Sequence, residues 1–447
     1  MVRRCRKALL LVSCLTGALL LGACRGGGGA TQTAEQDIPF PETTPFTAEE
    51  TARLHEIRDG VARIRGLAVN EDIGEGVVTE ADLRAYTERA FAGLDAEARN
   101  QLRIYELVWR LMRMIEPDDD FEDALISANS DQVAGLYVPK EKRLAIVAGQ
   151  KDGGKFEEFI MAHEYVHSFQ DKVIDLVAYH EKEEEAENTE RATTMSCVLE
   201  GDASVAAIQY MTDKYKGTSW TAELDSGDDE GEEDLPPALQ RYSEFDYNQC
   251  LSFVLTIQLL QGWDGVNKLL ENPPVSTEQI LHPEKYIAGE AAQDVSVLSL
   301  DDVLGSGWSL LEGADYGEFD VYNYLLTAGV AEPQAQAGAK GWGGGRMQVY
   351  TQGGDQPKNV LVHIALQWDT PADLNEYRQH LGWAIDHLGY EAVSRKSADG
   401  SWTWSSKKEY GYANWSEASK RVDILFANDQ VALLKARDAL RVAATAP

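Results

Sequence analysis

One predicted helix, at roughly residues 155–179, constrains the fold of this chain more than any other segment. Its apolar side chains recur every three to four residues, the spacing that gives a helix one continuous buried stripe. These positions are Phe156, Phe159, Ile160, Val166, Phe169 and Val173. Two apolar segments at 132–138 and 143–147 flank the turn residues 139–142, so a β-hairpin is predicted directly before the helix.

The rest of the chain divides into a helical part and a part with alternating strands. Helical spacing marks residues 47–115, 191–215 and 236–262, and shorter helices continue to residue 329. After the glycine-rich residues 341–345, strands are predicted at 347–350, 360–368, 391–396, 402–405 and 422–426, with helices at 371–388 and 430–443. We therefore expect an α+β protein, with a mainly helical domain at 47–340 that contains the hairpin and a small α+β sandwich domain at 341–447.

The first residues are typical of an export signal. Basic residues at positions 3, 4, 6 and 7 precede an apolar stretch at 8–21, which is short for a membrane-spanning helix. The next residues, Leu21-Gly22-Ala23-Cys24, resemble a bacterial lipobox, in which the cysteine is lipidated. We expect a signal peptide at 1–23, a lipid on Cys24 and a flexible tether at 24–46, in an exported protein anchored to a membrane of the cell envelope. A plain signal peptide or an uncleaved anchor is the alternative.

Charge excludes one class of partner. The 447 residues include 41 Lys and Arg against 74 Asp and Glu, a formal net charge of −33. Phosphate binding needs a net basic face, so this balance argues against nucleic acid as a partner. A good part of the excess negative charge lies in two blocks, residues 181–190 and 225–234, which like-charge repulsion favours as solvated loops.

Two cysteines remain in the folded body, Cys197 and Cys250. Export permits a disulfide between them. The alternative is two free thiols buried in apolar helices, and it is favoured because neither neighbourhood resembles a small disulfide-stabilised scaffold.

The predicted helix at 155–179 contains a motif typical of metal chemistry, His163-Glu164-Tyr165-Val166-His167. Residues four apart lie on one face of a helix, so His163 and His167 can bind one metal ion. Glu164 lies about 100° around the helix and can take a proton from an activated water. Zinc fits this set, since it uses neutral imidazoles with a third protein ligand and an open position.

Two residues are candidates for the third protein ligand of the metal ion. A metzincin would have a glycine at position 170 and a histidine at 173, where this chain has Gln170 and Val173, so that family is excluded. Glu200 is favoured because it lies in a largely uncharged helical stretch, where a lone carboxylate is costly without a partner. Glu187 has the spacing seen in thermolysin-like enzymes, but its acidic neighbours make it look like part of a solvated loop.

These motifs resemble those of gluzincin-type zinc peptidases. The sequence is most similar to a group of bacterial envelope proteins that read H-E-x-x-H-x-x-Q-D, followed later by E-G-D-A. Residues 163–171 and 200–203 match both parts, and the resemblance covers roughly residues 80–330. It implies a zinc metallopeptidase, with Asp171 and Asp202 as groups that orient ligand imidazoles. In such enzymes an edge strand before the motif helix binds extended substrate through its backbone.

The remaining site residues are less constrained. His282 or Tyr286, in a polar and turn-rich segment at 273–286, could donate a hydrogen bond to a transition-state oxyanion, although a structural role for this loop is slightly favoured. We expect hydrolysis of a peptide or protein substrate, with His163, His167 and Glu200 on zinc and Glu164 as general base. The alternatives are a non-catalytic lipoprotein with a structural metal site, whose C-terminal domain binds protein or cell-wall material, and a zinc hydrolase of a non-peptide amide.

Overall fold

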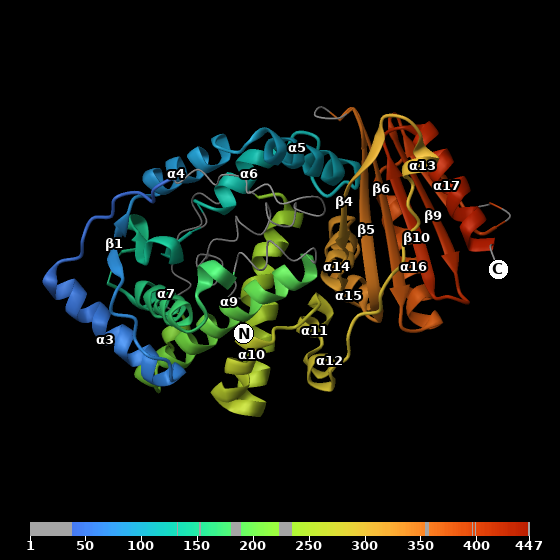
Figure 1. Cartoon of the computed structure of the whole chain (residues 1–447). Helices are drawn as coiled ribbons and strands as arrows, with labels where there is room; N and C mark the ends of the chain where they lie inside the picture. The colour runs from blue at the N-terminus through green and yellow to red at the C-terminus, as the bar shows by residue number, and fades with distance from the viewer. Residues whose placement is uncertain are drawn as a thin grey trace.

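The computed structural model describes residues 38–131, 133–151, 153–179, 189–222, 235–353, 357–395, 397 and 399–445. The expected fold class is confirmed. A mainly helical N-terminal region with a small mixed sheet is followed by an α+β region with a large antiparallel sheet (Figure 1). Within the described residues, no helix is both long and apolar enough to cross a membrane.

The helical region contains nine helices longer than one short turn among the described residues, together with three strands. Its helices are α3 (Ala48–Arg65), α4 (Glu80–Ala92), α5 (Ala96–Leu111), α6 (Phe121–Ala128), α7 (Lys155–Ile174), α9 (Thr189–Lys214), α10 (Pro237–Glu271), α11 (Thr277–Leu281) and α12 (Pro283–Ala288). Its strands are β1 (Gly74–Val78), β2 (Gly135–Val138) and β3 (Arg143–Val147), in the spatial order β1-β3-β2. Strands β2 and β3 form the predicted hairpin, and β1 adds a parallel strand that the sequence analysis missed.

Helix α7 is the central element of this region. It packs against α3, α9 and the hairpin strands, and its residues 157–171 are all buried. The helix ends at Ile174, earlier than predicted, because Asp175 adopts a left-handed conformation with φ of 51°. Helix α9 packs against α7, α10 packs against α9, and the two helices complete the main apolar core.

The C-terminal region is one seven-stranded sheet with helices on both faces. The strands are β4 (Trp308–Asp315), β5 (Trp342–Gln352), β6 (Asn359–Trp368), β7 (Ala392–Ser394), β8 (Trp402–Ser406), β9 (Glu409–Ser416) and β10 (Arg421–Ala427). The helices are α13 (Asp301–Leu304), α14 (Glu318–Thr327), α15 (Glu332–Ala339), α16 (Pro371–His387) and α17 (Gln430–Thr445). Strand β4 lies before residue 341 and pairs with β5 at one edge of the sheet.

Alternation along the strands gives this sheet two apolar faces. In β6, Val360, Val362 and Ile364 face α14, α15 and α16, whereas Leu361 faces α17 and α13. Figure 1 shows these helices on opposite sides of the strands, with α5 reaching over from the helical region. Tryptophans crowd the first of these cores, as expected for the core of a small domain.

Candidate metal centre

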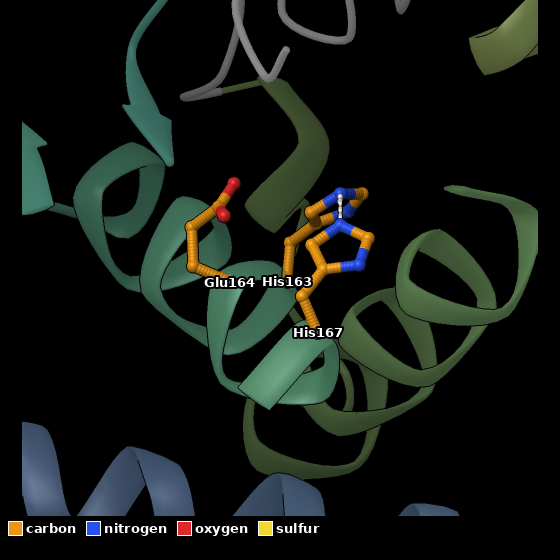
Figure 2. Close-up of side chains that lie close together, drawn as sticks. All are labelled: His163, Glu164 and His167. Carbon is orange, nitrogen blue, oxygen red and sulfur yellow. Dashed lines mark hydrogen bonds between the residues drawn. The ribbon is translucent and has the colours of Figure 1, made fainter. Parts of the chain in front are cut away.

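Helix α7 brings two imidazoles together. His163 and His167 lie four residues apart, and their Nε2 atoms are 3.0 Å from each other. The Glu164 carboxylate has an oxygen within 4.8 Å of a nitrogen of each ring. Figure 2 shows the two rings meeting through their nitrogens, joined by a dashed line, with Glu164 to one side on the same helix. The side chains are buried, so the chain contains a buried His-Glu-His group that could hold a metal ion.

Helix α9 presents Glu200 to both imidazoles. One carboxylate oxygen, Oε2, lies 3.2 Å from His163 Nε2, and the other, Oε1, lies 3.6 Å from His167 Nε2. The next residue explains how α9 is placed: a Cβ at Gly201 would lie 2.5 Å from the carbonyl oxygen of Cys250 on α10. Only glycine allows α9 and α10 to approach this closely, and Glu200 is thereby presented to α7.

A disulfide between Cys197 and Cys250 joins the same two helices. The expectation of two free thiols was therefore wrong. The close approach at Gly201 brings the α9 and α10 backbones near enough for the bond, with a Cα–Cα distance of 5.0 Å between the cysteines.

The donor atoms fit a tetrahedral zinc ion. Zinc binds nitrogen and carboxylate oxygen at about 2.0–2.2 Å, which sets the donors about 3.3 Å apart in a tetrahedron. The three separations among His163, His167 and Glu200 run from 3.0 to 3.6 Å. Two nitrogens and one oxygen are also the donor types that catalytic zinc uses, so these residues fit the expected ion.

The hydrogen bonds around His167 fix which ring nitrogen is protonated. The Gln170 amide nitrogen donates to two acceptors, the Leu199 carbonyl oxygen at 3.1 Å and Asp202 Oδ2 at 2.9 Å. The amide oxygen of Gln170 therefore faces His167 Nδ1, 2.8 Å away, and must accept a proton from it. His167 Nε2 is then unprotonated, and its lone pair points at His163 and Glu200. This tautomer is the one that binds a metal ion.

Burial keeps both rings neutral. It lowers the pKa of His163 to about 3 and the pKa of His167 to about 4, well below the usual value for histidine. Neutral imidazole is the metal-binding state, so both rings can act as ligands at neutral pH.

The two aspartates of the motifs have different contacts. Asp202 reaches the His167 imidazole through Gln170, which agrees with the orienting role that the resemblance implies. Asp171 instead accepts hydrogen bonds from Tyr137 of β2 and from Lys142 of the hairpin turn, each at 2.6 Å. Asp171 thus fixes the hairpin against the end of α7, one helical turn after His167.

Strand β2 lies directly on the motif helix. It is an edge strand of the small sheet, paired on one side with β3. A Cβ at Gly135 would lie 2.5 Å from Ile160 and 3.4 Å from the Cγ atom of Glu164. Glycine at this position lets the strand backbone approach the Glu164 side chain closely.

The other candidate residues have separate surroundings. His282 Nε2 lies 3.0 Å from Glu318 on α14, and this hydrogen bond raises the pKa of His282. Tyr286 donates its hydroxyl proton to the carbonyl oxygen of Asn272. Glu187 and Cys24 lie outside the described residues.

A second group of carboxylates, formed by Glu278, Glu290 and Asp369, surrounds a lysine. Lys285 Nζ contacts them at 2.6, 2.7 and 2.9 Å. The lysine forms an ion pair with each of the three carboxylates, so these residues form an ion-pair cluster that joins α12 to the C-terminal region.

Sequence reasoning missed two contributors to the site, Gln170 as the direct partner of His167 and Arg65 as the partner of Asp202. Gln170 is part of the H-E-x-x-H-x-x-Q-D pattern and could have been found there. Arg65 lies about a hundred residues earlier, on α3, and no local pattern marks it.

Comparison with known proteins informs only the C-terminal region. A family model described as a domain of unknown function (DUF8575) matches residues 310–440. No curated protein and no solved structure matches the chain. The matched span begins well after α7 and α9, so the candidate metal centre stands on its own residues and their geometry.

Proposed function

We propose that this protein is a zinc-dependent metallopeptidase. The observation that carries the proposal is the convergence of His163 Nε2, His167 Nε2 and the Glu200 carboxylate at 3.0–3.6 Å, beside the carboxylate of Glu164. His163, His167 and Glu200 would hold the ion. A bound zinc ion lowers the pKa of water and polarises a carbonyl group.

The residues of the chain perform the remaining steps. Glu164 takes a proton from the attacking water and later gives it to the leaving amine. Strand β2, the edge strand of the small sheet next to Glu164, would align an extended peptide by backbone hydrogen bonds. A role for His282 as an oxyanion donor remains a prediction from the sequence.

Replacing Glu164 tests this proposal. We expect Glu164→Gln to keep stoichiometric zinc, measured by elemental analysis, while hydrolysis of an unfolded protein falls by about 10²–10⁴-fold. Glu158→Gln is the matched control, since Glu158 is a buried carboxylate on the same helix that contacts Tyr210 and Tyr215. Purified wild-type protein without stoichiometric zinc, or a Glu164→Gln variant with wild-type hydrolysis, would refute the proposal.

Burial favours one second candidate, a structural metal site without catalysis. The side chains of His163, His167 and Glu200 are each 3% exposed or less. A structural ion would raise the melting temperature while wild-type protein hydrolyses no unfolded substrate. The same purified samples therefore distinguish the two candidates.

We also propose that the protein is exported and held to the cell-envelope membrane by a lipid on Cys24. The support is the sequence Leu21-Gly22-Ala23-Cys24 after a basic and apolar leader. Cys24→Ala should move the protein from the membrane fraction to the soluble or secreted fraction. Retention of this variant in the membrane with unchanged yield would argue for an uncleaved anchor.

A further inference from the structure

A buried arginine lies behind the candidate metal centre. Arg65 is the last residue of α3 and is 1% exposed. Its Nε donates a hydrogen bond to Asp202 Oδ1 over 2.5 Å, and both side chains are fully buried. The guanidinium carbon lies 4.7 Å from the centre of the Trp263 ring on α10, so the charge also contacts an aromatic face.

This ion pair continues into a chain of directed hydrogen bonds. Asp202 uses its second oxygen, Oδ2, to accept from Gln170, and Gln170 accepts from His167 Nδ1. Arg65 fixes Oδ1 and thereby turns Oδ2 towards the Gln170 amide nitrogen. The orientation of Gln170 in turn keeps the proton of His167 on Nδ1 and leaves the lone pair of Nε2 available to a metal ion.

Stability alone gives a poor account of this arrangement. Among the described residues, Arg65 Nη1 and Nη2 are buried without a hydrogen-bond partner. A buried guanidinium with one carboxylate bond carries a large desolvation cost, and an apolar pair of similar volume is often as stable or more stable. The arrangement does fix the orientation of Asp202, and that orientation is transmitted to a ligand imidazole.

We propose that Arg65 is a positioning residue for the metal ligand His167, acting through Asp202 and Gln170. The inference rests on the proposed zinc site. Arg65 touches neither the ion nor the substrate, and its effect is to hold the imidazole in the tautomer and direction that bind zinc. Second-sphere partners of this kind typically change metal affinity by about 10–100-fold.

Zinc affinity of the purified full-length protein tests the inference. We expect Arg65→Met and Asp202→Asn each to weaken zinc binding by about 10-fold or more, measured by competition with a chromophoric chelator. Both residues act through the same series of hydrogen bonds to His167. The double variant Arg65→Met/Asp202→Asn should therefore bind zinc no more weakly than the single variant with the lower zinc affinity. Fully additive losses would overturn the inference.

Arg53→Met is the matched control. Arg53 lies on the same helix as Arg65 and pairs with Glu157, at the start of α7 and away from the histidines. Loosening of α3 against α7 in general would lower zinc affinity in both variants, whereas a positioning role affects only Arg65→Met. Equal losses in the two variants would refute the positioning role.

A second variant tests the inference in case Arg65→Met does not fold. Arg65→Met/Asp202→Leu removes both charges and leaves no unpaired buried ion, so it should fold. It should still bind zinc about 10-fold more weakly than wild type. Wild-type affinity in this variant would overturn the inference while the zinc site itself stands, whereas wild-type protein that binds no zinc would overturn the proposed function.

Discussion

The helical region and the C-terminal sheet each bury a histidine against a carboxylate, and the two contacts differ in what balances the charge. In the sheet, His363 Nε2 lies 2.9 Å from Asp423, and the same carboxylate is bound by Arg421 at 2.7 and 2.9 Å. In the helical region, Glu200 faces two imidazoles that burial keeps neutral. The sheet thus supplies its own cation, whereas in our proposal zinc is the cation of the helical site.

This difference gives a criterion that separates a metal site from an ordinary buried histidine. A histidine beside a carboxylate occurs in both regions, so the pair alone is not diagnostic. At His163 and His167, two imidazole nitrogens converge on the Glu200 carboxylate, and Gln170 fixes the tautomer of the His167 ring. The same substitution made in both regions therefore tests whether only the helical one holds a metal ion.

The largest expected effect comes from removing one imidazole in each region. His167→Ala should lose stoichiometric zinc and all measurable hydrolysis, because a site with two protein ligands holds the ion poorly. His363→Ala should keep both properties. Elemental analysis and an unfolded-protein substrate measure the two outcomes. Loss of zinc from His363→Ala, or retention by His167→Ala, would contradict the distinction between the regions.

The next effect concerns stability in the sheet. Trp368 is fully buried and stacks on Tyr377 with ring centroids 4.7 Å apart. Trp368→Ala should lower the free energy of unfolding by about 3–5 kcal/mol. Zinc content per folded molecule should not change, since the sheet core is separate from the donors. Denaturant unfolding and elemental analysis of the folded fraction test this, and a zinc loss as large as that of His167→Ala would count against it.

A somewhat smaller effect is expected from the disulfide, which lies in the helical region alone. Cys197 and Cys250 are 53 residues apart in sequence, and replacing both by alanine should cost about 2–4 kcal/mol of unfolding free energy. A thiol reductant should lower the melting temperature of the wild type and leave that of the double variant unchanged. An equal melting temperature for reduced and oxidised wild type would disprove the stabilising role.

The smallest effect separates the two motif aspartates within the helical region. Asp202→Asn should weaken zinc binding by about 10–100-fold, because Asp202 holds Gln170 against His167. Asp171→Asn should leave zinc affinity unchanged and raise the KM for peptides, because it loosens Tyr137 of β2. Chelator competition and steady-state kinetics measure these changes. Equal loss of zinc affinity in both variants would show that Asp171 also orients a ligand.

The sequence allowed prediction of those features that depend on local spacing. Residues 163 and 167 must share a face on any α-helix, and the hairpin turn at 139–142 is a local signal, so both were predictable. Strand β1 was missed because its five residues, Gly74–Val78, are short and pair with β3 only after a long chain excursion. The disulfide and Arg65 escaped prediction for a related reason: each depends on how helices distant in sequence pack.

The disulfide also has a consequence for the order of events during biosynthesis. Cys197 lies one helical turn before Glu200 on α9, and its bond to Cys250 fixes that turn against α10. A newly made chain in a reducing compartment carries both thiols free. The disulfide therefore adds its restraint on the Glu200-bearing turn only after oxidation, beyond the packing of α9 on α10 at Gly201. Export, as proposed above, would thus place closure of this bond after the chain has left the compartment of its synthesis.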